Sequence, residues 1–156
     1  STPKEAVAVP SGREIAETLS VGDVVGEVAV TVTDAMVDAY AAAVGDFNPL
    51  FIFMEKDGAG ARSAHPELLP KFAMDSLWLP TFERMPNIRA KQAYTYLEPV
   101  QTGLTYRATG YVAEKYEKRG RLFVVFEAIF KDAKGREVLR DRRTQLVLSE
   151  EVTIKN

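Results

Sequence analysis

The residues best suited to chemistry lie in one long segment, positions 45–65, which is rich in Gly, Pro, Asp and Asn. It contains the run Gly-Asp-Phe-Asn-Pro and ends at His65, the only histidine of the chain. Carboxyl and imidazole groups are the side chains that most often move protons in enzymes. A loop of this length in a small domain is often functional. The first candidates for acid/base chemistry are therefore Asp46 and His65.

The composition limits what such a site can contain. The chain has no cysteine, which excludes a thiolate nucleophile, an iron–sulfur cluster, a zinc–thiolate site and any disulfide. One histidine excludes a site built on several histidine ligands. We expect no metal ion and no cofactor. The net charge is −2, from 20 Lys and Arg against 22 Asp and Glu, so no global basic field attracts nucleic acid or a membrane surface.

The 156 residues, 46% of them hydrophobic, are enough for one domain with its own core. We interpret residues 1–20 as an N-terminal arm, because Pro and Gly interrupt them and apolar positions are sparse, and residues 21–150 as a single domain. The chain has no apolar run of about 18 residues, so we expect no transmembrane helix. The first residues lack the apolar core of a signal peptide. We expect a cytoplasmic protein.

The apolar pattern predicts the elements that position the candidate residues. It predicts a strand over 28–32, a helix from Thr33 or Asp34 to Gly45, and a mostly buried helix from Pro66 to about Phe82. The rest of the chain is typical of antiparallel strands joined by turns. These strands are expected over 89–97, 104–117, 121–131 and 137–148. The third has apolar residues on both faces, which indicates burial on both sides or a dimer contact. The elements predict an α+β fold, a curled antiparallel sheet around one long helix.

Several stretches resemble the MaoC-like family of (R)-specific enoyl-thioester hydratases and dehydratases, in the hotdog superfamily. The chain has Gly-Asp-Phe-Asn-Pro-Leu at 45–50 and Ala-His-Pro at 64–66. The family has Gly-Asp-x-Asn-Pro-Leu-His and, before its central helix, Ala-His-Gly. The resemblance covers all but the N-terminal arm. It implies a hotdog fold, a curled antiparallel β-sheet wrapped around a long central α-helix, and an acyl thioester of coenzyme A or of an acyl carrier protein as the substrate.

The resemblance fails at two positions that matter for chemistry. In the family, the Asp and the His five residues later activate water or move protons, and the backbone N–H of the last Gly polarises the thioester carbonyl. Here Asp46 is kept, Phe51 stands at the His position and Pro66 stands at the Gly position. Phenylalanine transfers no proton, and proline has no N–H to donate. Both losses together argue against the family's standard hydration chemistry in this chain alone.

Each candidate in the long segment has two interpretations. Asp46 is either an acid/base group, with His65 in a rebuilt site, or a loop cap that, with Asn48, binds backbone N–H groups. His65 itself either replaces the missing base or packs at the helix N-terminus. Phe47 and Phe51 either line an acyl tunnel, where Asn48 would also contact substrate, or pack in the core.

Two further groups lie in the strand region. The hydroxyl of Tyr94 either orients a polar substrate or belongs to an ordinary sheet residue. Arg136, Arg140, Arg142 and Arg143 form a basic run that suits the phosphates of coenzyme A or of a carrier prosthetic group, or else a solvated edge. On a strand, Arg140 and Arg142 share one face and Arg143 takes the other.

Three functions remain open. The one that we favour is an enzyme, a hydratase or dehydratase of acyl thioesters that uses Asp46 with an altered partner. The second is a non-catalytic acyl-binding subunit of a heterodimeric dehydratase, and the third is a binding module for a small apolar ligand. Because hotdog domains usually pair by joining their sheets, the resemblance implies a homodimer or a heterodimer with a related hotdog subunit.

Overall fold

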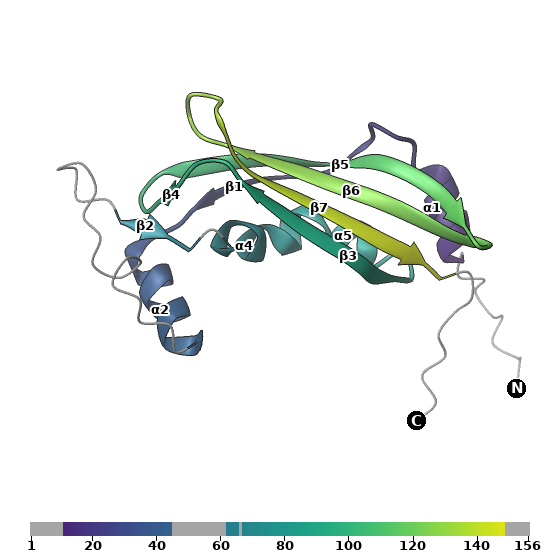
Figure 1. Cartoon of the computed structure of the whole chain (residues 1–156), viewed down its shortest axis with the longest axis horizontal. Coiled ribbons are helices and arrows are strands. Elements are labelled where there is room, and N and C mark those ends of the chain that lie inside the picture. The colour runs from purple at the N-terminus through teal and green to yellow at the C-terminus, as the bar shows by residue number, and fades with distance from the viewer. Residues whose placement is uncertain (1–10, 45–61, 66, 149–156) are drawn as a thin grey trace, which may run out of the picture.

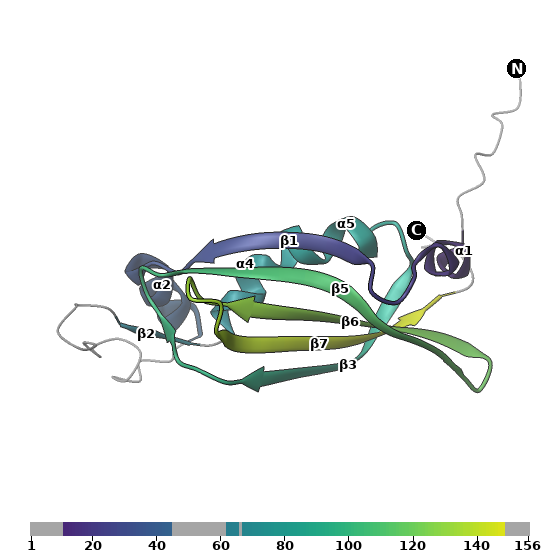
Figure 2. The same cartoon turned by 90° about the horizontal axis from the view of Figure 1, so that it is seen from above.

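The computed structural model describes residues 11–44, 62–65 and 67–148 (Figure 1). Their main element is a five-stranded antiparallel sheet with the strand order β1-β5-β6-β7-β3. The strands are β1 (Val24–Thr31), β3 (Asn87–Tyr96), β5 (Thr105–Lys118), β6 (Arg121–Lys131) and β7 (Glu137–Val147). The sheet curls along its length, and the helices α4 and α5 lie against one of its faces (Figures 1 and 2). The predicted strands and the α+β class are confirmed.

Two short strands form a separate ladder that the sequence pattern does not predict. They are β2 (Ser63–Ala64) and β4 (Val100–Gln101). The ladder is extended by the Thr102 N–H, which donates to the carbonyl of Arg62 at 2.7 Å. Arg62 also forms ion pairs with Asp34 and Asp38 of α2 (Asp34–Val44). These contacts fix the chain that leads into the candidate residue His65.

The predicted long helix is instead two helices, α4 (Leu68–Leu77) and α5 (Leu79–Phe82), which meet at Trp78. The break has a local cause, because Pro80 has no N–H for the carbonyl of Ser76 and its ring crowds that carbonyl. The helical hydrogen bonding of α4 continues up to the break, because the Trp78 N–H donates to the Met74 carbonyl at 3.0 Å. The single long central helix that was expected is therefore wrong in detail, although its span is helical.

The helices lie unusually close to the sheet at two glycines. A Cβ atom on Gly26 of β1 would lie 2.6 Å from the carbonyl oxygens of both Ser76 and Leu77. A Cβ atom on Gly110 of β5 would lie 2.9 Å from the Trp78 ring. Neither distance leaves room for a side chain, so these glycines let the end of α4 rest directly on the backbone of the sheet.

The core lies between this face of the sheet and the helices. Trp78 is fully buried and packs edge-on against Phe126, with ring centroids 5.8 Å apart. Phe82 stacks on the Trp78 ring at 6.0 Å and also packs edge-on against Phe126 at 5.2 Å, so the three rings form one cluster. The largest other fully buried side chains are Tyr106, Phe130, Leu68, Leu69, Leu77, Met85 and Leu139. Burial of aromatic and aliphatic area on this scale is the main stabilising contribution to a domain of this size.

The described part of the predicted arm is packed on the domain. Residues Gly12–Thr18 form α1, whose first turn is capped by the Ser11 hydroxyl, which accepts from the Glu14 N–H at 3.2 Å. Ala16 is fully buried in the core. Gly12, one of the glycines and prolines that the sequence analysis treats as interruptions, is therefore the first residue of a helix. The buried face of this helix is too small to stand out as an apolar pattern.

Candidate functional site

The structure describes only part of the predicted site. Of the six candidate residues, it describes His65 and Tyr94. The other four, Asp46, Phe47, Asn48 and Phe51, lie outside the described residues, as does Pro66. Their predicted roles stay predictions.

His65 lies between the β2 strand and the start of α4, and it is half-buried. Its ring is 5.4 Å from the ring of Tyr40, which α2 supplies. The Glu67 N–H donates to His65 Nδ1 at 3.3 Å, and the Leu68 N–H donates to the His65 carbonyl at 3.0 Å. Because Nδ1 accepts, a neutral imidazole here carries its proton on Nε2. One of the two interpretations of His65, packing at the start of the helix, is therefore present, and these contacts hold its ring in one orientation.

A cavity of about 440 Å³ lies close to this histidine. It is open on one side, and the residues around it come from α2, the start of α4, β3 and β7. Its lining consists of Tyr40, Glu67, Pro70, Lys71, Met74, Arg89, Gln92, Tyr94 and Arg143. The cavity therefore brings Tyr94, predicted from the strand region, to the same site as Tyr40, the ring neighbour of His65.

A buried ion pair forms one wall of the cavity. Asp141 is fully buried, and Arg143, with 5% of its surface exposed, donates from Nε to both carboxylate oxygens at 3.0 and 3.2 Å. Gln92 Nε2 lies 3.5 Å from the same carboxylate and donates to the Tyr94 hydroxyl at 2.6 Å. Arg89 Nη1 donates to the side-chain oxygen Oε1 of Gln92 at 2.7 Å. The wall is thus one connected hydrogen-bond network across β3 and β7.

Burial dominates the protonation of this network. It raises the pKa of Asp141, while the charge and hydrogen bonds of Arg143 act in the opposite direction. The indole N–H of Trp78 is buried without a hydrogen bond of good geometry, but it lies close enough to the carboxylate to lower the pKa as well. Burial, followed by the Asp141 charge, raises the pKa of Tyr94. The Tyr94 hydroxyl therefore stays protonated at neutral pH and can donate a hydrogen bond.

The basic run of β7 is divided between the two faces of the sheet, as the strand geometry predicts. Arg140 pairs with Glu137 on the outer face, and Arg142 pairs with Glu127 and Glu114. Arg143 turns inward, where its guanidinium lies 5.7 Å from the Trp78 ring. The predicted division of the run is therefore present, with Arg143 on the opposite face from Arg140 and Arg142.

Sequence reasoning missed Asp141. A signal for it was present, because Asp141 and Arg143 are two residues apart on one strand and so share a face. That face also carries Leu139 and Val147, which are buried. Two opposite charges two residues apart, on a face that also carries buried apolar residues, indicate a buried pair.

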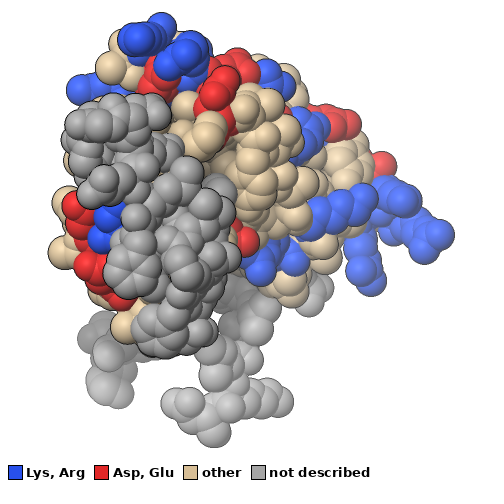
Figure 3. Space-filling view, turned by 60° about the vertical axis from the view of Figure 1, so that its left-hand side comes forward, with Lys and Arg blue, Asp and Glu red and all other residues tan. Residues whose placement is uncertain are grey.

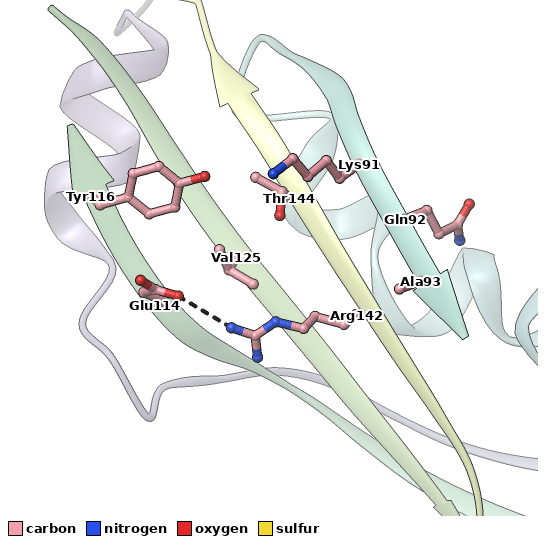
Figure 4. Close-up of a pocket in the computed structure, with 8 residues that line it drawn as sticks. All are labelled: Lys91, Gln92, Ala93, Glu114, Tyr116, Val125, Arg142 and Thr144. Atoms are coloured by element: carbon pink, nitrogen blue, oxygen red, sulfur yellow. Dashed lines mark hydrogen bonds and ion pairs between the residues drawn. The ribbon is translucent and has the colours of Figure 1, made fainter. Parts of the chain in front are cut away.

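The other face of the sheet carries a second hollow, a groove of about 650 Å³ (Figure 4). Val125 and Thr144 lie in it, and both are buried. Arg142 donates to Glu114 across the groove at 3.2 Å, whereas Gln92 points away from the residues around it (Figure 4). The predicted two-sided burial of β6 is confirmed at Val125. None of the predicted site residues that the structure describes lines this groove, whereas Tyr94 lines the inner cavity, so the inner cavity is the better candidate site.

The surface charges, the metal-binding side chains and the lengths of the helices can be described for the same residues. Figure 3 shows Lys and Arg in separate groups with Asp and Glu between them on the side that it presents. Within residues 11–44, 62–65 and 67–148, no three His, Asp or Glu side chains gather into a group that could hold a metal ion. No helix in the same ranges is long and apolar enough to cross a membrane.

Comparison with known proteins gives a consistent fold. No family model and no curated protein sequence matches the chain. Among solved structures, the MaoC-like dehydratase from Rhodospirillum rubrum matches with a TM-score of 0.66 and 21% identity, over 87% of this chain and 97% of that one. The (R)-hydratase from A. caviae involved in PHA biosynthesis matches with a TM-score of 0.66 and 20% identity, over 83% and 97%.

A two-subunit relative is also similar. The HadBC (3R)-hydroxyacyl-ACP dehydratase complex from Mycobacterium tuberculosis matches with a TM-score of 0.64 and 20% identity, over 76% of this chain and 90% of that one. At these identities the likeness establishes the three-dimensional arrangement of the chain. The chain therefore has the hotdog fold of MaoC-like dehydratases and (R)-hydratases.

Proposed function

We propose that this chain is an enzyme, a hydratase or dehydratase of an acyl thioester of coenzyme A or of an acyl carrier protein. The observation that carries the proposal is the cavity beside His65 and Tyr40, at the start of α4 in a hotdog fold. The motif with Asp46 follows α2 directly in the sequence, and α2 supplies Tyr40 to the cavity. Proteins with the same fold are named as hydratases and dehydratases.

The roles follow from the chemistry of hydration. Water adds its oxygen to C3 of the enoyl group, one proton goes to C2, and negative charge develops on the thioester oxygen. Asp46 accepts the proton from water and returns one to C2, a task that a carboxylate performs in general acid/base catalysis. His65, with its proton on Nε2, donates a hydrogen bond to the thioester oxygen in place of the N–H that Pro66 lacks. Tyr94 binds the substrate through its hydroxyl.

The remaining candidates bind the acyl chain. Phe47 and Phe51 supply apolar contact, and Asn48 supplies a hydrogen bond. The site is non-standard because Phe51 cannot act as the family's histidine. A cytoplasmic location stays a prediction from the sequence.

A non-catalytic role is the second candidate function. Phe51 and Pro66 remove two catalytic devices, which suits an acyl-binding subunit whose partner carries catalysis. HadBC shows that a dehydratase of this fold is a complex of two chains. A binding module for a small apolar ligand is a weaker alternative, because cations and hydroxyl groups line much of the cavity.

We further propose a dimer joined along β3. This strand is at one edge of the sheet. Ile88 on it is 55% exposed, Tyr96 is 49% exposed, and Leu97 follows at 46%. An edge strand with exposed apolar residues is suited to pairing with another chain. The partner is a second copy or a related hotdog subunit.

Hydration of trans-2-enoyl-CoA substrates tests the proposed enzyme. The purified chain is assayed by loss of the enoyl absorbance, with short and medium acyl chains. We expect turnover that falls at least about 100-fold in Asp46→Ala, in line with the usual contribution of a positioned acid/base group. Asp75→Ala, at an exposed position of α4, is the matched control and should keep full activity.

Two other results would redirect the interpretation. Turnover that Asp46→Ala leaves intact would show that Asp46 is not the acid/base group. No turnover on any chain length would contradict the enzyme and favour the acyl-binding subunit, whose catalytic partner would then be sought by copurification.

A further inference from the structure

The inner cavity has an unusual charge for a site that holds an acyl chain. Lys71, Arg89 and Arg143 line it, and Glu67 is the one acidic residue in its lining. Directly behind the wall lies the carboxylate of Asp141. Three cations against two carboxylates leave one net positive charge. An alkyl chain gives no interaction that would balance that charge.

Arg143 is held in place for binding. Its Nε is fixed by both oxygens of Asp141, and its Nη1 lies 3.1 Å from the sulfur of Met74. Its Nη2 has no hydrogen-bond partner among the described residues. A buried ion pair contributes little net stability compared with packed apolar side chains. Stability therefore does not explain this pair, whereas a preoriented donor at a binding site does.

The other cations and one neutral donor complete the site. Arg89 is tied to Gln92, and Gln92 is tied to Tyr94, so these side chains are ordered relative to one another. Lys71 Nζ lies over the Tyr40 ring, 5.1 Å from its centroid. Tyr94 keeps its phenolic proton. The cavity therefore offers guanidinium, ammonium and hydroxyl donors to one ligand.

Both charge and size select the ligand. A guanidinium matches the planar geometry of a carboxylate, and the one net positive charge matches its single negative charge better than that of a phosphate dianion. The volume of about 440 Å³ is near the lower end of ligand sites, which span roughly 300–1,000 Å³. The charge of the lining therefore favours a singly charged anion, and a hollow of this volume has room for a short acyl group.

We propose that the acyl group held in this cavity carries a carboxylate, which binds Arg143 with the support of Lys71 and Arg89. This inference rests on the proposed function for its thioester end. The substrate class is then the thioester of a short dicarboxylic acid. Arg143 is the residue that determines this specificity, and Asp141 is the residue that positions Arg143.

Calorimetric titration of the full chain tests the inference without turnover. Monoethyl succinate has an ester in place of the thioester and a free carboxylate at the other end. Ethyl butyrate is its uncharged match, and inorganic phosphate is the alternative anion. We expect monoethyl succinate to bind at least about 10-fold more tightly than either of the others, because hydrogen bonds between a guanidinium and a carboxylate are much stronger than those between neutral groups. Equal binding of ethyl butyrate, or tighter binding of phosphate, would overturn the proposal.

Variants locate the binding. Lys71→Met and Arg89→Met, both at exposed positions, should each weaken monoethyl succinate binding about 2- to 5-fold. Lys91→Met is the matched control, because Lys91 lies on the same strand but lines the outer groove. The Lys91→Met variant should bind monoethyl succinate as tightly as the wild type. An equal loss in Lys91→Met and Arg89→Met would show a general charge effect and overturn the assigned site.

Arg143 needs a second variant, because Arg143→Met leaves the Asp141 carboxylate buried and alone. The double variant Asp141→Asn/Arg143→Met removes both charges and keeps the packing volume similar. We expect it to fold and to lose the preference for monoethyl succinate over ethyl butyrate. A folded double variant that keeps the preference would refute the role of Arg143.

The two proposals fail separately. Binding of monoethyl succinate together with no hydration of any enoyl thioester would overturn the enzyme and leave the carboxylate site. Hydration of simple enoyl thioesters with no preference for a carboxylate-bearing acyl chain would overturn the carboxylate site and leave the enzyme.

Discussion

At the residue scale, the pair Asp141 and Arg143 is the least expected feature of the chain. Removing one partner of a buried ion pair is far more damaging than never having had it, because the remaining charge keeps its desolvation penalty. The contacts of the Asp141 carboxylate are with Arg143, Gln92 and the Trp78 indole. The stability of the fold therefore depends on Asp141 and Arg143 being present together. The protonation of Asp141 can be followed through stability.

The pH dependence of unfolding should reveal Asp141. Because its folded pKa is raised above the unfolded value of about 3.8, the folded state binds more protons in the window above that value. Stability then falls as pH rises through this window, from the unfolded pKa to the folded one. The quantity to follow is the melting temperature of the wild type minus that of Asp141→Asn. We expect this difference to fall as pH rises from about 4. Glu83→Gln, at an exposed residue, is the control. A flat difference across this range would contradict the raised pKa.

At the element scale, the close seating of α4 on β1 depends on Gly26. A methyl group there meets two carbonyl oxygens of the backbone, which cannot rotate away as a side chain can. The helix or the strand must therefore move.

Gly26→Ala should lower the free energy of unfolding by about 1–3 kcal/mol, the usual cost of overpacking a core. Denaturant unfolding followed by circular dichroism measures it. Glu27→Ala, at the next and exposed position of β1, should change stability little. If Gly26→Ala unfolds at the same denaturant concentration as the wild type, the helix is not seated as tightly as described.

The same elements show what the sequence could predict. Runs of β-branched and aromatic residues, bounded by turns that contain glycine, located β5, β6 and β7. The break at Trp78 could not be seen, because Pro80 lies where an apolar periodicity continues. The ladder of β2 with β4 has two residues in each strand, which is too short for any period. In the candidate site, His65 and Tyr94 were found by residue type, whereas Asp141 was hidden within a run of arginines.

At the scale of the whole molecule, the position of the cavity relates the site to assembly. Arg89 and Tyr94 lie on β3, which is an edge strand, so the cavity is next to the proposed dimer interface. A partner that adds its own strand to β3 would lie beside the site. Assembly and binding should therefore be linked.

The two edges of the sheet provide a matched test of the dimer. Ile88 on β3 and Val24 on β1 are 55% and 59% exposed. If β3 is the interface, Ile88→Lys should convert the dimer to monomers at micromolar concentration, because a buried lysine at a joined edge loses its hydration. Val24→Lys should leave the assembly intact. Analytical ultracentrifugation measures both, and dissociation by Val24→Lys alone would place the interface at β1.

The pairing of β3 with β7 shifts between Arg89 and Lys91, where Ala90 has no partner in the ladder. Arg89 thus lines the inner cavity and Lys91 the outer groove, although residues two apart on a regular strand share a face. The extra residue is absorbed locally, so a shorter relative that lacks it would keep every other side chain of the strand on its present face. In an alignment, a one-residue gap at position 90 would then leave the linings of the inner cavity and of the outer groove unchanged. The same gap two or three positions later would move the side chains between position 90 and the gap to the opposite face of the sheet.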